Sequence, residues 1–136
     1  MRFFSLDEVL SIHAHQIAVY GGSLGIRDVG LLQSALHMPE ATAFGQELHP
    51  TLHEKAAAYL FHIVRNHPFI DGNKRAGLSV CLAFLDAEGF FVEASEDDLV
   101  ELVLGVARGE RTKAEVSVFL SRHSRPLSDP IPEPEA

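Results

Sequence analysis

The sequence predicts a single, all-α domain, and three observations support that prediction. A chain of 136 residues, 46% of them hydrophobic, fits one domain with a substantial core. Residues 52–64 and 76–87 are apolar on nearly every face, a pattern typical of helices at the centre of a domain. The only strand-like run, residues 90–92, is too short to build a sheet. We therefore expect a helical bundle around a buried central hairpin formed by the two apolar segments.

Start and stop signals place the N-terminal elements. The Ser-x-x-Glu pattern at Ser5 predicts the start of a first helix, and the glycine pair after Tyr20 predicts its end. Residues 21–30 contain four glycines and indicate a mobile loop. A short helix is expected from Val29 to Met38, followed by irregular structure over residues 39–50.

Two further helices and a tail are expected after the central hairpin. One helix begins at Ser95, and the last begins at Thr112, which opens a second capping-box pattern. Beyond residue 123 the chain becomes rich in proline and acidic residues. Such a composition cannot bury enough apolar surface to fold, so residues 124–136 are predicted to be a disordered tail and residues 1–123 the domain.

Composition excludes several classes of function. The net charge is −8, with 11 Lys and Arg against 19 Asp and Glu, so general nucleic-acid binding is disfavoured. No stretch approaches the roughly 20 apolar residues that span a bilayer, so no membrane association is expected. A single cysteine, Cys81, cannot form an internal disulfide, and the simplest interpretation is a cytoplasmic protein.

The residues between the two apolar helices suit phosphate chemistry. Gly72 and Asn73 lie where the second of these helices begins, so their backbone N–H groups are expected to be free for an anion. Lys74 and Arg75 add two positive charges. We call the whole stretch the motif segment; it reads His67-Pro68-Phe69-Ile70-Asp71-Gly72-Asn73-Lys74-Arg75.

Two further residues of the motif segment suggest a transfer reaction. Asp71 is a carboxylate beside the predicted anion site, where Mg²⁺ would bridge it to nucleotide phosphates. His67 can act as a general base near neutral pH. The alternative is structural, because Asp-Gly-Asn is a good turn sequence and His-Pro can simply end a helix. The position of the motif segment between two buried helices favours the functional interpretation over the structural one, since unpaired charges are costly there.

The motif segment resembles the signature of the Fic/Doc superfamily, H-P-F-x-[D/E]-G-N-G-R-x-x-R. Seven of its nine specified positions match in order, and the likeness extends over residues 1 to about 123. The resemblance implies a Fic/Doc helical bundle that uses ATP and Mg²⁺. It also implies His67 as base, Asp71 as Mg²⁺ ligand, and an anion site made by Gly72 and Asn73. Arg75 would bind phosphate.

The stretches Tyr20–Gly22 and Gly25–Leu32 are similar to the death-on-curing (Doc) branch, which contains toxins of toxin–antitoxin pairs. By this resemblance a short flap would position the target segment. We call the flap residues 25–28; they are Gly25, Ile26, Arg27 and Asp28.

Two departures from the family pattern bear on the reaction. Lys74 replaces a glycine, and Leu78 replaces the final arginine. Members with the full pattern transfer AMP, whereas the Doc branch, which shares Asn-Lys-Arg, phosphorylates a threonine of elongation factor Tu. The resemblance therefore implies a toxin kinase held in check by a small antitoxin protein. Fic-type AMP transfer and a non-catalytic binding module remain alternatives.

The other titratable residues are expected to be structural. His13 and His15 are two residues apart on a helix and cannot share a metal ion. His49 and His53 have suitable spacing but lack a third ligand. His62 is expected at the surface or at a helix end, and Cys81 in the core.

Overall fold

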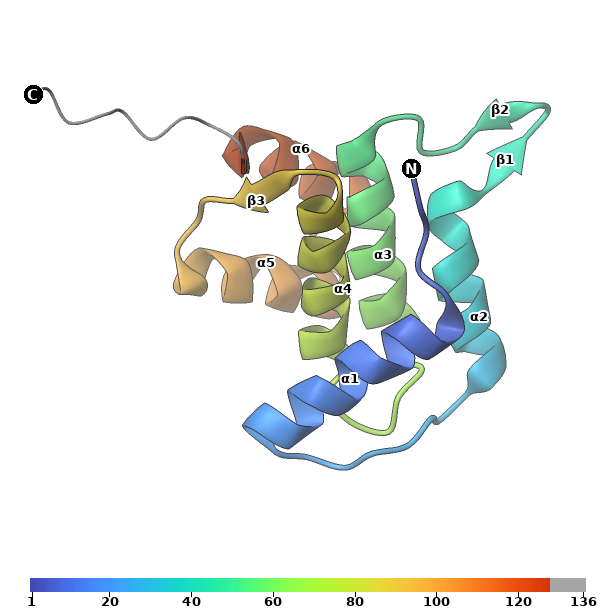
Figure 1. Ribbon diagram of the computed structural model, residues 1–136, viewed down its shortest axis with the longest axis vertical. Helices are drawn as coiled ribbons and strands as arrows, with labels where there is room; N and C mark the ends of the chain where they lie inside the picture. The colour runs from blue at the N-terminus through green and yellow to red at the C-terminus, as the bar shows by residue number, and fades with distance from the viewer. Residues whose placement is uncertain (128–136) are drawn as a thin grey trace, which may run out of the picture.

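The computed structural model describes residues 1–127, and within them six α-helices dominate (Figure 1). The predicted helical fold is confirmed, but it is mostly α and not all-α, because two small antiparallel sheets are also present. Residues 90–92, expected to be too short for a sheet, form a strand in one of them. None of the helices in this range is long and apolar enough to cross a membrane. The elements are α1 (Leu6–Tyr20), α2 (Val29–His37), a 3₁₀ turn η1 (Met38–Glu40), β1 (Thr42–Ala43), β2 (Gln46–Glu47), α3 (Leu52–Asn66), α4 (Asn73–Ala87), β3 (Phe90–Val92), α5 (Glu96–Ala107), α6 (Lys113–His123) and β4 (Ser124–Pro126).

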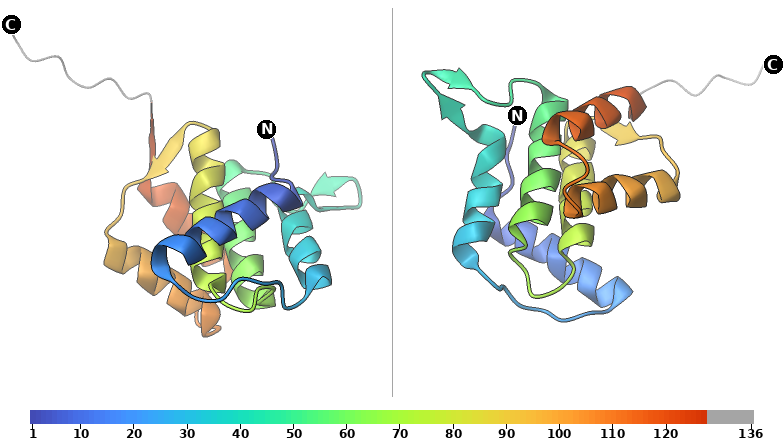
Figure 2. Two further views of the ribbon diagram at one scale, coloured as in Figure 1. Left: turned by 60° about the horizontal axis from the view of Figure 1, so that its bottom comes forward. Right: turned by 180° about the vertical axis from the view of Figure 1, so that it is seen from behind.

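The predicted buried hairpin is α3 and α4, which lie side by side at the centre of the molecule (Figures 1 and 2). On one side Tyr59 of α3 packs with residues of α1, α2 and α4. On the other side Leu60 of α3 packs with residues of α4, α5 and α6. Gly77 allows the close approach of the pair, because a Cβ there would lie 2.7 Å from a methyl carbon of Val64. Helices buried on two faces explain the all-round apolar sequence.

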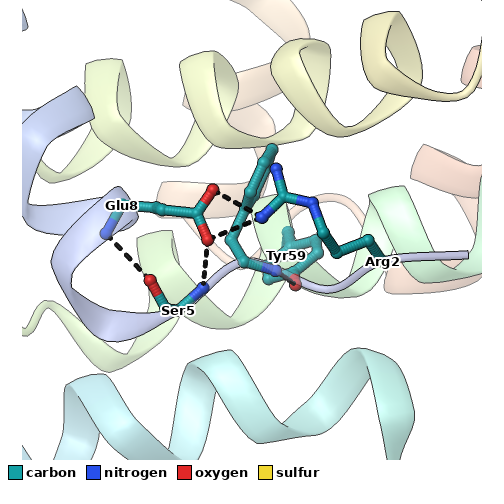
Figure 3. Close-up of polar contacts among 5 residues, drawn as sticks. Arg2, Ser5, Glu8 and Tyr59 are labelled. Carbon is teal, nitrogen blue, oxygen red and sulfur yellow. Dashed lines mark hydrogen bonds and ion pairs between the residues drawn. The ribbon is translucent and has the colours of Figure 1, made fainter.

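The N-terminal capping box is confirmed. The Glu8 N–H donates to the Ser5 hydroxyl at 3.2 Å, and the Ser5 N–H donates to the Glu8 carboxylate at 3.1 Å (Figure 3). Arg2 pairs with the same carboxylate at 2.8 Å. The Tyr59 hydroxyl accepts a hydrogen bond from the Phe4 N–H at 3.0 Å. These contacts fasten the start of α1, and the bond to Tyr59 ties the segment before it to α3.

Two regions differ from the sequence-based expectation. Residues 39–50 were expected to be irregular, but β1 and β2 form a hairpin in which Thr42 pairs with Glu47. Residues 124–126, expected to belong to the tail, form β4, which pairs with β3, Val92 opposite Ser124, and so supplies partners for backbone groups of β3. Residues 128–136 of the predicted tail lie outside the described residues.

Candidate functional site

The motif segment connects α3 to α4 through two left-handed residues. His67 ends α3 with φ 51° and ψ 53°, and Gly72 precedes α4 with φ 77° and ψ 20°. A left-handed conformation costs a non-glycine residue about 1–2 kcal/mol, so the surrounding contacts must hold His67 in place. The reversal leaves the His67 side chain exposed and puts the first turn of α4 beside it.

Asn73 closes the motif segment from within. Its side-chain oxygen accepts from the Phe69 N–H at 2.9 Å, and its side-chain nitrogen donates to the Phe69 carbonyl at 3.0 Å. Only 5% of Asn73 is exposed. The expected place of Asn73 in an anion site therefore applies to its backbone alone, because the side chain is used to fasten the loop.

The N-terminus of α4 has free donors, but not at both positions that the sequence predicted. The Gly72 N–H, expected to be free, donates to the Asp71 carboxylate at 2.9 Å. The first helical hydrogen bond runs from the Ala76 N–H to the Gly72 carbonyl, at 2.9 Å. The N–H groups of Asn73, Lys74 and Arg75 consequently have no acceptor within the helix. Together with the helix dipole they make this end of α4 attractive to anions.

The flap is hydrogen-bonded to the motif segment. The N–H groups of Arg27 and Asp28 both donate to the Pro68 carbonyl, at 2.7 and 3.0 Å, and the Ile70 N–H donates to the Gly25 carbonyl at 3.1 Å. The Arg27 guanidinium donates to the carbonyl of His67 at 2.7 Å. The expectation of a mobile loop over residues 21–30 is therefore corrected for its second half, since these bonds fix it against the motif segment.

A cavity of about 380 Å³ brings the predicted motif residues together. The flap residues do not line it. Sequence reasoning missed Arg65 and Ala107, which lie on its wall because the Arg65 guanidinium reaches the Ala107 carbonyl at the end of α5, at 3.3 Å. The lining residues are Val64, Arg65, His67, Ile70, Asp71, Gly72, Asn73, Lys74, Arg75 and Ala107.

The charge around this cavity is locally positive although the whole chain is acidic. Arg65, Lys74 and Arg75 line it, and Asp71 is the only carboxylate among the lining residues. The Arg75 guanidinium lies 4.9 Å from the centre of the Tyr20 ring, which limits the directions it can take. An anionic ligand fits this combination of cations and free backbone donors.

The Asp71 carboxylate fits a cation between protein and phosphate. Its two oxygens accept from the Gly72 N–H at 2.9 Å and from the Ser23 N–H at 3.2 Å, and each keeps capacity for another partner. Gly22 leaves the space beside it, since a Cβ there would lie 2.6 Å from a carboxylate oxygen. One carboxylate plus substrate phosphates is the usual protein environment of Mg²⁺.

His13 of α1 supports the motif segment from beneath, and sequence reasoning did not find it. Its Nε2 lies 2.7 Å from the Asp71 carbonyl oxygen, and its ring stacks on Phe69 with centroids 3.8 Å apart. A signal was present: His13 is four residues from both Val9 and Ile17, which are buried on the same face of α1. A polar residue on such a face is expected to have a partner.

His62 and Cys81 are not among the residues that line this cavity. His62, expected at the surface or at a helix end, is half-buried within α3. Burial and the nearby Lys113 lower its pKa to about 4. Cys81 is buried as expected, and burial raises the pKa of its thiol to about 12. Over residues 1–127 no group of three or more His, Cys, Asp or Glu is placed to hold a metal ion.

Comparison with known proteins gives concordant matches. A family model described as the Fic/DOC family matches residues 3–85. The chain is 37% identical to "Toxin Doc" of Mycolicibacterium smegmatis, over 87% of this chain and 93% of that protein. It is 34% identical to "Protein kinase doc" of Escherichia phage P1, over 90% of this chain and 95% of that protein. The matched family region includes α1, the flap and the whole motif segment.

Proposed function

The chain belongs to the Fic/DOC family, and on that premise we propose that it is a Doc-like toxin that transfers the γ-phosphate of ATP to a hydroxyl of a protein. The observation that carries the proposal is the cavity in which His67, Asp71 and the N-terminus of α4 meet. The names of two similar proteins, a toxin and a protein kinase, support the same class.

In the proposed reaction each residue of the cavity has one task. His67, exposed at the cavity, accepts the proton of the target hydroxyl as its oxygen bonds to the γ-phosphorus. The bond from that phosphorus to the bridging oxygen breaks, and ADP leaves. Asp71 would hold Mg²⁺, which neutralises phosphate charge. The N–H groups at the start of α4, with Lys74 and Arg75, bind the phosphate oxygens.

Two positions favour phosphoryl transfer over AMP transfer. Lys74 lines the cavity with a charged side chain where the usual family pattern has a bare glycine backbone. Leu78 is partly buried against the core formed by α3, α5 and α6, so it supplies no phosphate clamp in place of the usual arginine. Both features disfavour the nucleotide position that AMP transfer requires.

We propose a protein target and a separate antitoxin protein as partners, with elongation factor Tu as the first target to test. Exposed apolar side chains border the site, which is typical of a protein-binding surface. They are Tyr20, which lies against the Arg75 guanidinium, Ile26, which pairs with Phe69 of the motif segment, and Ile70, which lines the cavity.

Many family members restrain themselves with a helix bearing [S/T]-x-x-x-E-[G/N], whose glutamate pairs with the final arginine of the family pattern. A brake of that type does not fit this chain, because Leu78 replaces the arginine and Phe84 stands where the serine or threonine would be. The only Glu-Gly pair is Glu88-Gly89, and Glu88 follows the last residue of α4. It lies about 22 Å from the motif end of that helix, at 1.5 Å per residue.

Co-expression with the product of an adjacent reading frame, the proposed antitoxin, is expected to restore growth and to yield a stable complex. A protein that transfers phosphate in vitro but is harmless to its host would contradict the toxin role.

The reaction is tested by incubating the protein and Mg²⁺ with cell-extract proteins and ATP labelled at the α- or the γ-phosphate. A protein labelled only by the γ-phosphate supports phosphoryl transfer, and a protein labelled by the α-phosphate identifies AMP transfer. A lack of any labelled protein supports a binding module.

The His67→Ala variant should fold normally and transfer phosphate at least about 10²-fold more slowly, the usual effect of losing a general base. Exposed His15 on α1 offers a matched control, His15→Ala, which should transfer like the wild type.

A further inference from the structure

His13 is the buried polar side chain that joins α1 to the motif segment. We propose that it is a positioning residue, which holds the Asp71 carbonyl and thereby aims the Asp71 carboxylate and the first turn of α4 at the cavity. Its expected effect on turnover rests on the proposed function. Its effect on the loop does not.

The contact is well defined chemically. A carbonyl oxygen only accepts, so Nε2 of His13 carries the hydrogen that bonds to Asp71 O over 2.7 Å. The ring lies flat on the Phe69 ring, with 4° between their planes, and only 3% of His13 is exposed. One side chain therefore fixes both the position and the orientation of the peptide that carries Asp71.

The place of that peptide explains why its orientation matters. Asp71 is followed by Gly72, where the chain turns into α4, and a Cβ at Gly72 would lie 3.5 Å from His13 Nε2. On its other side the Asp71 carboxylate is held by the Ser23 N–H. Asp71 is thus held at its carbonyl by α1 and at its carboxylate by the loop that follows α1.

A purely structural histidine would behave differently from a positioning one. If His13 only fills space, His13→Phe should retain function, because it keeps a ring to stack on Phe69. If the hydrogen bond matters, His13→Phe should impair the site and His13→Gln should rescue it, since the glutamine amide nitrogen can reach the Asp71 carbonyl. Loss of such an indirect contact typically costs about 10- to 100-fold in affinity or activity.

The experiment compares the full-length wild type with His13→Phe, His13→Gln and the exposed control His15→Phe. Hydrogen exchange of residues 66–76, MgATP affinity by calorimetry, and kcat and KM with γ-labelled ATP are measured. For His13→Phe we expect exchange about 10-fold faster over residues 66–76 but unchanged over α6, and kcat or MgATP affinity at least about 10-fold lower. His13→Gln should recover most of each loss, and His15→Phe should match the wild type.

Two results would overturn the proposal. One is a His13→Phe variant within twofold of the wild type in both loop exchange and MgATP affinity. The other is equal impairment of the Phe and Gln variants. If His13→Phe does not fold, His13→Asn, whose amide is too short to reach Asp71, takes its place in the comparison. A wild type that neither binds MgATP nor transfers label refutes the proposed function, while loop exchange still decides the role of His13.

Discussion

Replacing Asn73 by alanine tests how the motif segment is held together. The change removes two hydrogen bonds to Phe69, at 2.9 and 3.0 Å, and leaves that residue's N–H and carbonyl without these partners in the core. An unsatisfied buried group costs about 1–3 kcal/mol. Because the loop can relax, we expect the free energy of unfolding to fall by about 2–4 kcal/mol in total.

Urea denaturation followed by far-ultraviolet circular dichroism measures this loss, since the chain contains no tryptophan for fluorescence. With a urea dependence of about 2 kcal/mol per molar, the midpoint should fall by about 1–2 M. The matched control is Lys74→Ala, the adjacent and exposed residue of α4, which should stay within about 0.5 kcal/mol of the wild type.

A second variant checks the direction of the two bonds. Asn73→Asp keeps an acceptor for the Phe69 N–H but places an oxygen against the Phe69 carbonyl, so it should be at least as destabilised as Asn73→Ala. If Asn73→Ala were as stable as Lys74→Ala, the Asn73 side chain would not fasten the motif segment, and its role as a clamp would be refuted.

Three further outcomes are expected. Asp71→Ala should lose most of its Mg²⁺-dependent ATP affinity in calorimetry with little change in stability, whereas unchanged Mg²⁺ dependence would leave Asp71 as a turn residue. Lys74→Gly should weaken γ-phosphate transfer or shift labelling toward the α-phosphate; equal phosphorylation by the variant would refute the role given to this lysine. The pKa of His62 is about 4 in the native state, against 6.5 for a free side chain. As the pH falls from 6.5 toward 4, this histidine is protonated in the unfolded chain but not in the native state, so the free energy of unfolding decreases. Between pH 7 and pH 4.5 the free energy of unfolding of His62→Gln should therefore fall by about 2 kcal/mol less than that of the wild type, allowing for the partial exposure of His62. Urea titrations at the two pH values measure this difference, and equal decreases in the two proteins would contradict the lowered pKa.

The sequence alone determined the features that depend on neighbours along the chain. The capping boxes at Ser5 and Thr112 are formed by residues three positions apart, and both are present. The all-round apolar pattern predicted the burial of α3 and α4 because periodicity reports how many faces a helix hides. The motif segment is continuous, so its residues had to be close in space, and the six that were predicted to act line one cavity.

Tertiary structure decided what depends on residues far apart in the chain. His13 and Asp71 are 58 positions apart, and Arg65 and Ala107 are 42 apart, so no local pattern connects them. The same reason applies to the flap, which looked mobile from its glycines but finds hydrogen-bond acceptors 40 positions away. Asn73 shows most clearly what the sequence cannot decide, because an asparagine at this position suits either an anion site or a clamp for the loop. In the structure its side chain bonds the backbone of Phe69, since polar groups buried in the core must be paired.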